Sequence, residues 1–121
     1  MVECLCEPAT HGVIGNNWYV PSLKKMIYCA EDSLVSNVGG TPENGKISPR
    51  NLLTTTITDE LRLSTGKRSK VVGIAIKDRG ASFPAGHTGD AYWYDDANGD
   101  WMTSTYYKQT LPSWVANFNA K

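Results

Sequence analysis

The chain has few cysteines, and their arrangement excludes a disulfide-stabilised scaffold. Cys4, Cys6 and Cys29 are the three cysteines among 121 residues, and no C-x-x-C is present. The count is odd, and Cys4 and Cys6 are too close in sequence to pair comfortably. A metal site built from these thiols and His11 is the alternative, but the spacing favours isolated, reduced thiols.

An excess of charge of one sign and a long apolar run are also missing. Twelve basic residues balance twelve acidic ones, so no broad attraction to nucleic acid or to an anionic membrane is expected. No apolar run approaches the roughly 20 residues that span a bilayer. The opening "MVECLCEPATHG" has neither a basic nor an apolar signal-peptide region. We therefore expect neither a nucleic acid polymer nor a membrane as a partner.

The composition is that of one ordinary globular unit: 121 residues, 40% hydrophobic and 20% charged. The runs 16–20 ("NNWYV") and 26–29 ("MIYC") predict two short strands joined across "PSLKK". Residues 30–47 are polar and rich in turn-forming residues, which predicts one long loop. Loops of this length inside a small domain are often functional.

The segment 48–66 predicts the longest helix. Ser48 is placed to cap it, Pro49 falls at the first helical position, and Gly66 can close its end. Apolar side chains recur at helical spacing: Leu53, Ile57 and Leu61.

The next run, 70–76 ("KVVGIAI"), is apolar without alternation. That pattern predicts a strand buried on both faces, as central parallel strands are. A helix followed by such a strand is the second half of a βαβ unit, so its first strand is expected near Trp18 or Ile27.

Residues 91–107 predict a hairpin with arms 91–94 and 101–107 and Asn98-Gly99 in the turn. The C-terminal stretch carries one helical stripe: Leu111, Trp114, Val115 and Phe118. The fold class is therefore α/β, with one or two central strands, flanking helices and a β-hairpin.

Lys77 and Arg79 end the apolar run on either side of Asp78. Ligands of open α/β sheets bind beyond the carboxyl ends of the parallel strands. With strand alternation the two cations would point the same way, and an anion between them would relieve their repulsion. A lysine point charge and a planar arginine fork suit phosphate or carboxylate oxygens. A solvated strand end, with Asp78 pairing one neighbour, is the alternative that the pattern alone favours.

Two further motifs are weaker candidates. In "HGVIGNNWY" the glycines permit a tight backbone, and the amide of Asn16 could donate to an oxyanion, although Asn and Gly are also ordinary turn residues. His87 in "FPAGHTGD" is expected to be structural. The acidic residues of the hairpin lack the spacing of a calcium loop.

Six segments together resemble a known family: "HGVIGNNWY", "MIYCAED", "ISPRNLLTTTITDELRL", "KVVGIAIKDRGASFPAGH", "AYWYDDANGDW" and "STYYKQTLPSWV". They resemble consecutive segments of the phosphate-irrepressible alkaline phosphatases. This group is close to the nucleotide pyrophosphatase/phosphodiesterases within the alkaline phosphatase superfamily. The resemblance runs from about Pro8 to the C-terminus and implies that residues 1–121 are a single partial domain, a fragment of a larger catalytic domain.

The resemblance implies hydrolysis of phosphate esters by two zinc ions and a covalent phospho-enzyme. It assigns the asparagine after H-G-x-x-G, here Asn16, to a phosphate oxygen. It assigns the lysine and arginine of K-D-R, here Lys77 and Arg79, to the phosphate oxygens of a monoester. These three are the expected substrate-binding residues.

The family's nucleophile lies about twenty residues before that asparagine, and Thr10 does not match it. The zinc ligands are likewise expected outside this sequence, one upstream and the others far downstream of Phe118. We therefore expect no catalytic residue, no metal ligand and no cofactor in this chain, and no hydrolysis by the chain alone. Zinc-dependent hydrolysis of an aryl phosphate by the pure chain would contradict this expectation.

Two other hypotheses remain open. The chain could be a non-catalytic binding or interaction module derived from the same fold, or an independent enzyme with a site around His87 and the acidic cluster. The expected ligand is phosphate or a phosphate ester. A small piece of a large sheet leaves apolar surface uncovered, so self-association into a homo-oligomer is expected. The family is periplasmic or secreted, which gives localisation by resemblance only.

Overall fold

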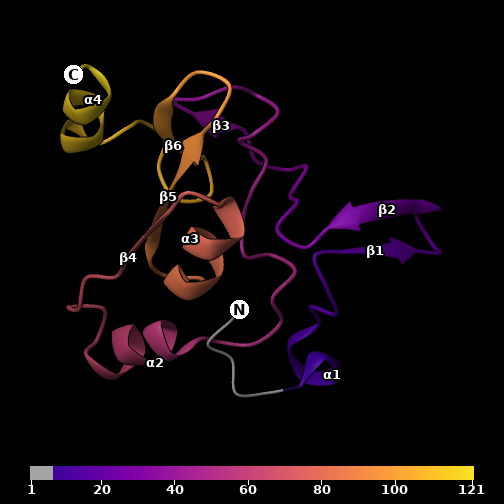
Figure 1. The fold of residues 1–121 in the computed structure, drawn as a ribbon. Helices are drawn as coiled ribbons and strands as arrows, with labels where there is room; N and C mark the ends of the chain where they lie inside the picture. Colours follow the sequence, from indigo (N-terminus) through magenta and orange to yellow (C-terminus); the bar gives the residue numbers. More distant parts are fainter. Residues whose placement is uncertain (1–6) are drawn as a thin grey trace.

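The structure, a computed structural model, describes residues 7–121 and contains a four-stranded mixed sheet flanked by helices (Figure 1). Its strands, in the order β3-β6-β5-β4, are Asn37–Val38, Asp100–Ser104, Asp90–Asp95 and Val72–Ala75. The pair β4–β5 is parallel and the other pairs are antiparallel. The α/β class predicted from the sequence is thus present.

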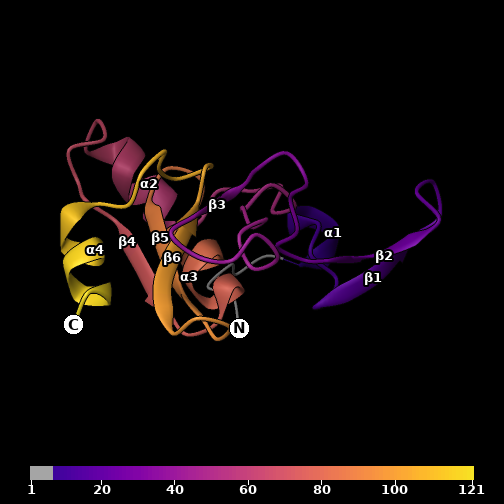
Figure 2. The same cartoon turned by 90° about the horizontal axis from the view of Figure 1, so that it is seen from above.

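A separate hairpin, β1 (Asn17–Val20) and β2 (Lys25–Tyr28), projects from this body (Figures 1 and 2). The two strands pair antiparallel, with Trp18 opposite Ile27. They are the two strands predicted across "PSLKK", and that prediction is confirmed. A short helix, α1 (Pro8–His11), precedes them.

The βαβ unit is β4-α3-β5, in which α3 spans Asp78–Ala85. The prediction that places its first strand near Trp18 or Ile27 is wrong, because β1 and β2 pair with each other and β4 itself is the first strand. The expectation that β4 is buried on both faces is also wrong. Val72 and Ile74 are about half exposed, since β4 is the edge strand of the described sheet and α3 covers one face.

The long helix is shorter than predicted: α2 spans Ile57–Ser64 and is capped by Thr56, not by Ser48. The Thr56 hydroxyl accepts from the Asp59 backbone N–H, and the Asp59 carboxylate accepts from the Thr56 N–H. This capping box fixes the start of the helix. The Ser48 hydroxyl instead donates to Asp32. Leu53, one of the three residues of the predicted apolar stripe, lies before the helix and is exposed.

The segment 30–47 is mostly irregular but includes β3, which pairs with β6, and a bridge between Glu31 and Ile47. Strands β5 and β6 pair antiparallel where the sequence predicts a hairpin. The last helix, α4 (Ser113–Asn119), lies where the C-terminal apolar stripe predicts a helix.

The sheet has a helix on each face (Figure 2). On the side of α3, Trp93 and Met102 are fully buried in the hydrophobic core. On the side of α4, the Tyr92 ring packs edge-on against Trp114, with 5.0 Å between centroids. Consecutive residues of β5 therefore face opposite layers, as strand geometry requires. Among the described residues, no helix has the length and apolar character needed to cross a membrane.

Candidate anion-binding site

Lys77 and Arg79 lie at the junction between β4 and α3. The strand ends at Ala75, Lys77 is the N-cap of α3 with an extended backbone, and the helix begins at Asp78. The predicted strand alternation of the two cations is therefore wrong, because the chain has already turned into a helix at Arg79. The start of α3 adds the positive end of a helix dipole beside both side chains.

Both cations nevertheless line one hollow of about 250 Å³. Strands β4 and β5 are parallel, with Ala75 opposite Trp93, so their carboxyl ends meet at one edge of the sheet. The hollow at this edge is lined by Tyr28, Asn44, Ile76, Lys77, Asp78, Arg79, Trp93, Tyr94 and Asp96. The hollow lies where ligands of open α/β sheets bind.

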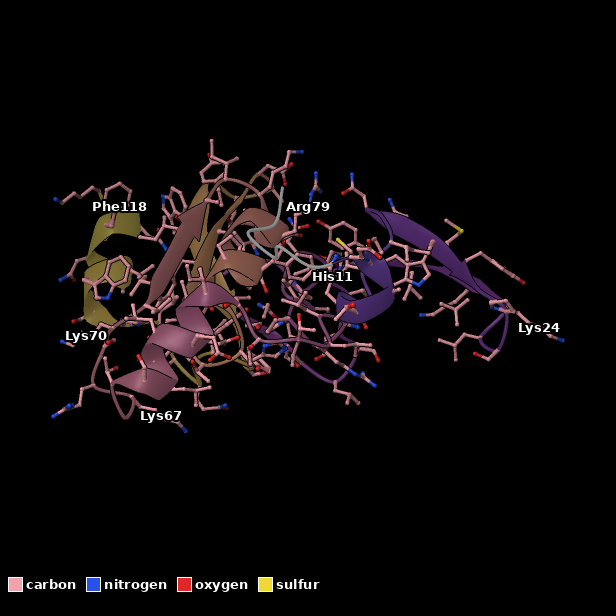
Figure 3. The ribbon with its side chains drawn as sticks, turned by 90° about the horizontal axis from the view of Figure 1, so that it is seen from below. His11, Lys24, Lys67, Lys70, Arg79 and Phe118 are labelled. Atoms are coloured by element: carbon pink, nitrogen blue, oxygen red, sulfur yellow. The ribbon has the colours of Figure 1, made fainter. Side chains whose placement is uncertain are left out.

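Tyr28, the last residue of β2, joins the hairpin to this junction. Its hydroxyl donates to Asp78 Oδ1 (2.5 Å) and accepts from Arg79 Nη1 (3.1 Å). Burial, followed by the bond to Asp78, raises the pKa of the tyrosine well above its ordinary value. The bond to Tyr28 raises the pKa of Arg79. The hydroxyl thus stays protonated and the guanidinium stays charged at neutral pH. Figure 3 shows Arg79 in the middle of the molecule, between Phe118 of α4 and Lys24 of the β1–β2 hairpin.

The opposite wall comes from β5 and from the segment 30–47. Asn44 is held there by three hydrogen bonds. Its side-chain amide donates to Asp95 (2.7 Å) and to Asp96 (3.4 Å), and its backbone carbonyl accepts from the Trp93 indole (3.0 Å). Tyr94 and Asp96 are exposed on the same wall. The hollow therefore combines two cations with two carboxylates, Asp78 and Asp96, and the exposed ring of Tyr94.

Asn16 does not line this hollow in the part of the chain that the structure describes. It is exposed just before β1, and its carbonyl accepts a bond from Cys29 N (2.8 Å). Cys29 directly follows Tyr28, the residue that contacts Arg79. The hydrogen bond to Cys29 therefore places the Asn16 backbone close to Tyr28. Convergence of its side chain with Lys77 and Arg79 on one anion stays a prediction.

His87 has a structural role. Its ring contacts Asp59 Oδ2 through Nδ1 (3.0 Å) and the Leu52 carbonyl through Nε2 (2.8 Å). Asp59 is buried and also accepts from the backbone N–H groups of Thr56, His87 and Thr88. Burial alone would raise the pKa of this carboxyl, but these bonds outweigh it and lower the pKa to about 2.

The cysteine predictions lie partly outside the described residues, since Cys4 and Cys6 precede residue 7. Cys29 is a buried free thiol. Within residues 7–121, no group of three or more His, Cys, Asp or Glu side chains is arranged to hold a metal ion.

Sequence reasoning did not connect Tyr28, Asn44 and Tyr94 with this hollow, and it considered Asp96 only within the acidic cluster of the hairpin. Tyr94 and Asp96 could have been found by pairing the run after residue 70 with the first arm of the hairpin, which brings their carboxyl ends together. Tyr28 has no comparable signal, because its partners lie about fifty positions further along the chain.

Comparison with curated proteins gives matches over nearly the whole chain, while no family model matches. The chain is 55% identical over 115 residues to alkaline phosphatase PhoV of Synechococcus elongatus. It is 51% identical over 117 residues to alkaline phosphatase PafA of Elizabethkingia meningoseptica. A protein of Myroides odoratus named calcium-transporting ATPase is 51% identical over 113 residues. Each match covers 93–94% of this chain but 21% of the relative, so the chain spans about a fifth of the length of these curated relatives.

The solved structures agree. The crystal structure of wild-type PafA matches with a TM-score of 0.91 and 49% identity, over 93% of this chain and 22% of the solved one. A PafA variant with one threonine, one asparagine, one lysine and one arginine substituted matches with the same TM-score and coverage and 46% identity.

The mixed sheet, its two helical layers and these matches define the chain as a segment of the alkaline phosphatase fold. Within that superfamily its sequence is homologous to the corresponding segment of the alkaline phosphatases PhoV and PafA.

Proposed function

We propose that this chain is the phosphate-ester-binding portion of an alkaline-phosphatase-like hydrolase. One observation carries the proposal: Lys77 and Arg79 line a single hollow at the carboxyl edge of the parallel strands β4 and β5. The chain bearing that hollow is homologous to a segment of alkaline phosphatases.

The spacing of the substitutions in the PafA variant supports the choice of residues. Its substituted lysine and arginine are two positions apart, as Lys77 and Arg79 are. Its substituted asparagine precedes the lysine by about sixty positions, close to the separation of Asn16 from Lys77. The same three residue types at nearly the same spacing support Asn16 as the third residue, with Lys77 and Arg79, of the proposed phosphate seat.

The chemistry of the seat suits the terminal oxygens of a phosphate monoester. Arg79 offers a planar fork of N–H donors, and Lys77 offers a mobile point charge. Bonds from charged donors to phosphate oxygens are among the stronger hydrogen bonds in proteins. Asp78 and Asp96 oppose anion binding, but Asp78 already accepts from Tyr28 and from the Arg79 backbone N–H.

Catalysis is a separate matter from binding. The metal that the resemblance implies is zinc, and the described residues do not fit it, since they contain no cluster of three or more ligating side chains. We propose that the chain binds phosphate without hydrolysing esters by itself.

Titration with inorganic phosphate, followed by NMR, tests the proposal. Lys77→Ala/Arg79→Ala is expected to weaken phosphate binding by at least about tenfold, since each charge-assisted bond contributes roughly 1.5–3 kcal/mol. Lys70→Ala/Lys121→Ala removes the same charge from two exposed positions and is expected to leave the affinity within about twofold. Equal losses in both double variants, or no binding by the wild type, would contradict the proposal. The same wild-type chain, supplied with zinc, is expected not to hydrolyse an aryl phosphate.

A further inference from the structure

Arg79 and Asp78 are neighbours of opposite charge, yet they are not among the ion pairs that the described residues form. The hydroxyl of Tyr28 lies between them instead. It donates to Asp78 Oδ1 at 2.5 Å and accepts from Arg79 Nη1 at 3.1 Å. A single hydroxyl can fill both roles, because it has one O–H donor and two acceptor lone pairs.

We infer that Tyr28 is a positioning residue that keeps the Arg79 guanidinium available to an anion. The inference rests on the proposed phosphate seat and concerns how its arginine is kept open. Tyr28 satisfies Asp78 with a neutral donor, so the carboxylate does not take up the guanidinium in a bidentate pair.

The inventory of Arg79 donors supports this role. A guanidinium has five N–H donors, and the contact with Tyr28 occupies one of them. No other described residue accepts a hydrogen bond from this side chain. Arg79 is half-buried on the wall of the hollow, where its remaining donors can meet phosphate oxygens.

The position of Tyr28 explains why this contact holds. The residue ends β2, opposite Asn17 in the hairpin, and its ring packs against the hydrophobic core. Strand β2, paired with β1, therefore places the Tyr28 hydroxyl at the β4–α3 junction, where the first turn of α3 places Asp78 and Arg79. Two elements far apart in sequence must both form before the arginine is oriented.

Removing only the hydroxyl tests the inference. In Tyr28→Phe the ring and its packing are retained, while Asp78 loses its donor and can pair directly with Arg79. Phosphate affinity is expected to fall about three- to tenfold. Tyr19→Phe is the matched control, since Tyr19 lies on the other strand of the same hairpin and is exposed; its affinity is expected to stay unchanged.

A double-mutant cycle separates positioning from general structural damage. In an Arg79→Ala background, Tyr28→Phe is expected to have no further effect on phosphate affinity. In a Lys77→Ala background it is expected to have its full effect. Asp78→Asn is expected to rescue Tyr28→Phe, because the competing charge is then gone. A loss that persists without Arg79, or that Asp78→Asn does not rescue, would overturn the inference.

The outcomes also distinguish this inference from the proposed function. If the wild type does not bind phosphate, or if Lys77→Ala/Arg79→Ala binds as the wild type does, the seat itself is refuted. If binding depends on both cations but Tyr28→Phe is neutral, only the role of Tyr28 is refuted. Should Tyr28→Phe not fold, the wild-type Arg79 side-chain NMR signals decide. Before phosphate is added, we expect slow rotation of the Arg79 guanidinium, because Tyr28 accepts a hydrogen bond from it. Guanidinium N–H signals averaged by fast rotation would overturn the inference.

Discussion

At the scale of single residues, Asp59 shows how one carboxylate can organise several parts of the chain. It completes the capping box of α2 with Thr56 and accepts from the backbone N–H groups of His87 and Thr88. The His87 ring closes the cluster by contacting both Asp59 and the Leu52 carbonyl. The turn after α3 is thereby fixed to the start of α2.

Asp59→Asn is expected to destabilise the fold by about 2–3 kcal/mol in urea denaturation at neutral pH. The amide cannot replace a charged acceptor of several bonds in a buried position. Glu60→Gln, on the next and exposed residue, is the control and is expected to change the free energy of unfolding by less than about 0.5 kcal/mol. Equal effects of the two substitutions would contradict the role of Asp59.

The stability of the wild type is expected to depend on pH through the same carboxylate. Folding lowers the pKa of Asp59 from 3.8 to about 2. The contribution is therefore present above pH 3.8 and is lost as the pH falls toward 2. Denaturation curves measured at several pH values should show a smaller acid loss in Asp59→Asn than in the wild type. An identical acid loss in both proteins would show that another group is responsible.

At the scale of elements, the close packing of α3 on β4 positions the candidate site. Gly73 in β4 lies against the Ala81 backbone, where an added Cβ would collide with the Ala81 carbonyl oxygen. A glycine in a strand interior commonly marks such a close approach. The contact sets the distance between the strand and the helix that carries Arg79.

Gly73→Ala is expected to destabilise the fold by about 1–3 kcal/mol, because α3 must move away from the sheet. Val72→Ala, at the half-exposed neighbouring position, is the control and is expected to cost less than about 1 kcal/mol. Thermal unfolding followed by circular dichroism measures both. An unchanged unfolding temperature in Gly73→Ala would mean that the packing of α3 on β4 is looser than the structure shows.

At the scale of the whole molecule, the described fold leaves apolar surface uncovered beside β4. Val72, Ile74 and Ile76 are all about half exposed or more, and the outer edge of β4 has no partner strand among the described residues. A groove of about 170 Å³ between the sheet and α4 continues this surface, and Trp114 and Phe118 line it. Exposed edges and patches of this kind favour association.

We propose that the isolated chain self-associates through this surface. Light scattering is expected to give a mass above the 13.3 kDa of one chain, rising with concentration. Val72→Lys/Ile74→Lys is expected to shift the mass toward one chain, because charges on an edge strand oppose pairing. Leu34→Lys, at an exposed position in the segment 30–47, should leave the association unchanged. A monodisperse monomer would refute the proposal.

Local signals in the sequence were sufficient to predict those elements that can be recognised without their tertiary partners. Strands β1 and β2 lie where two short aromatic and aliphatic runs predict them, and helix α4 lies where the apolar stripe predicts it. The predicted helix start at Ser48 is wrong because the sequence offers two N-cap residues, Ser48 and Thr56. Only the reciprocal hydrogen bonds of Thr56 and Asp59 select the later one.

The amino-acid sequence by itself determined the α/β class, the short strands of the hairpin and the presence of two cations at the end of an apolar run. These follow from local preferences, which act within a few residues. The tertiary structure alone decided that β4 pairs with β5, that Arg79 belongs to a helix, and that Tyr28 separates it from Asp78. The Tyr28 contacts join residues about fifty positions apart, and the strand pairing joins Val72 with Asp90, so only the packing of whole elements brings these residues together.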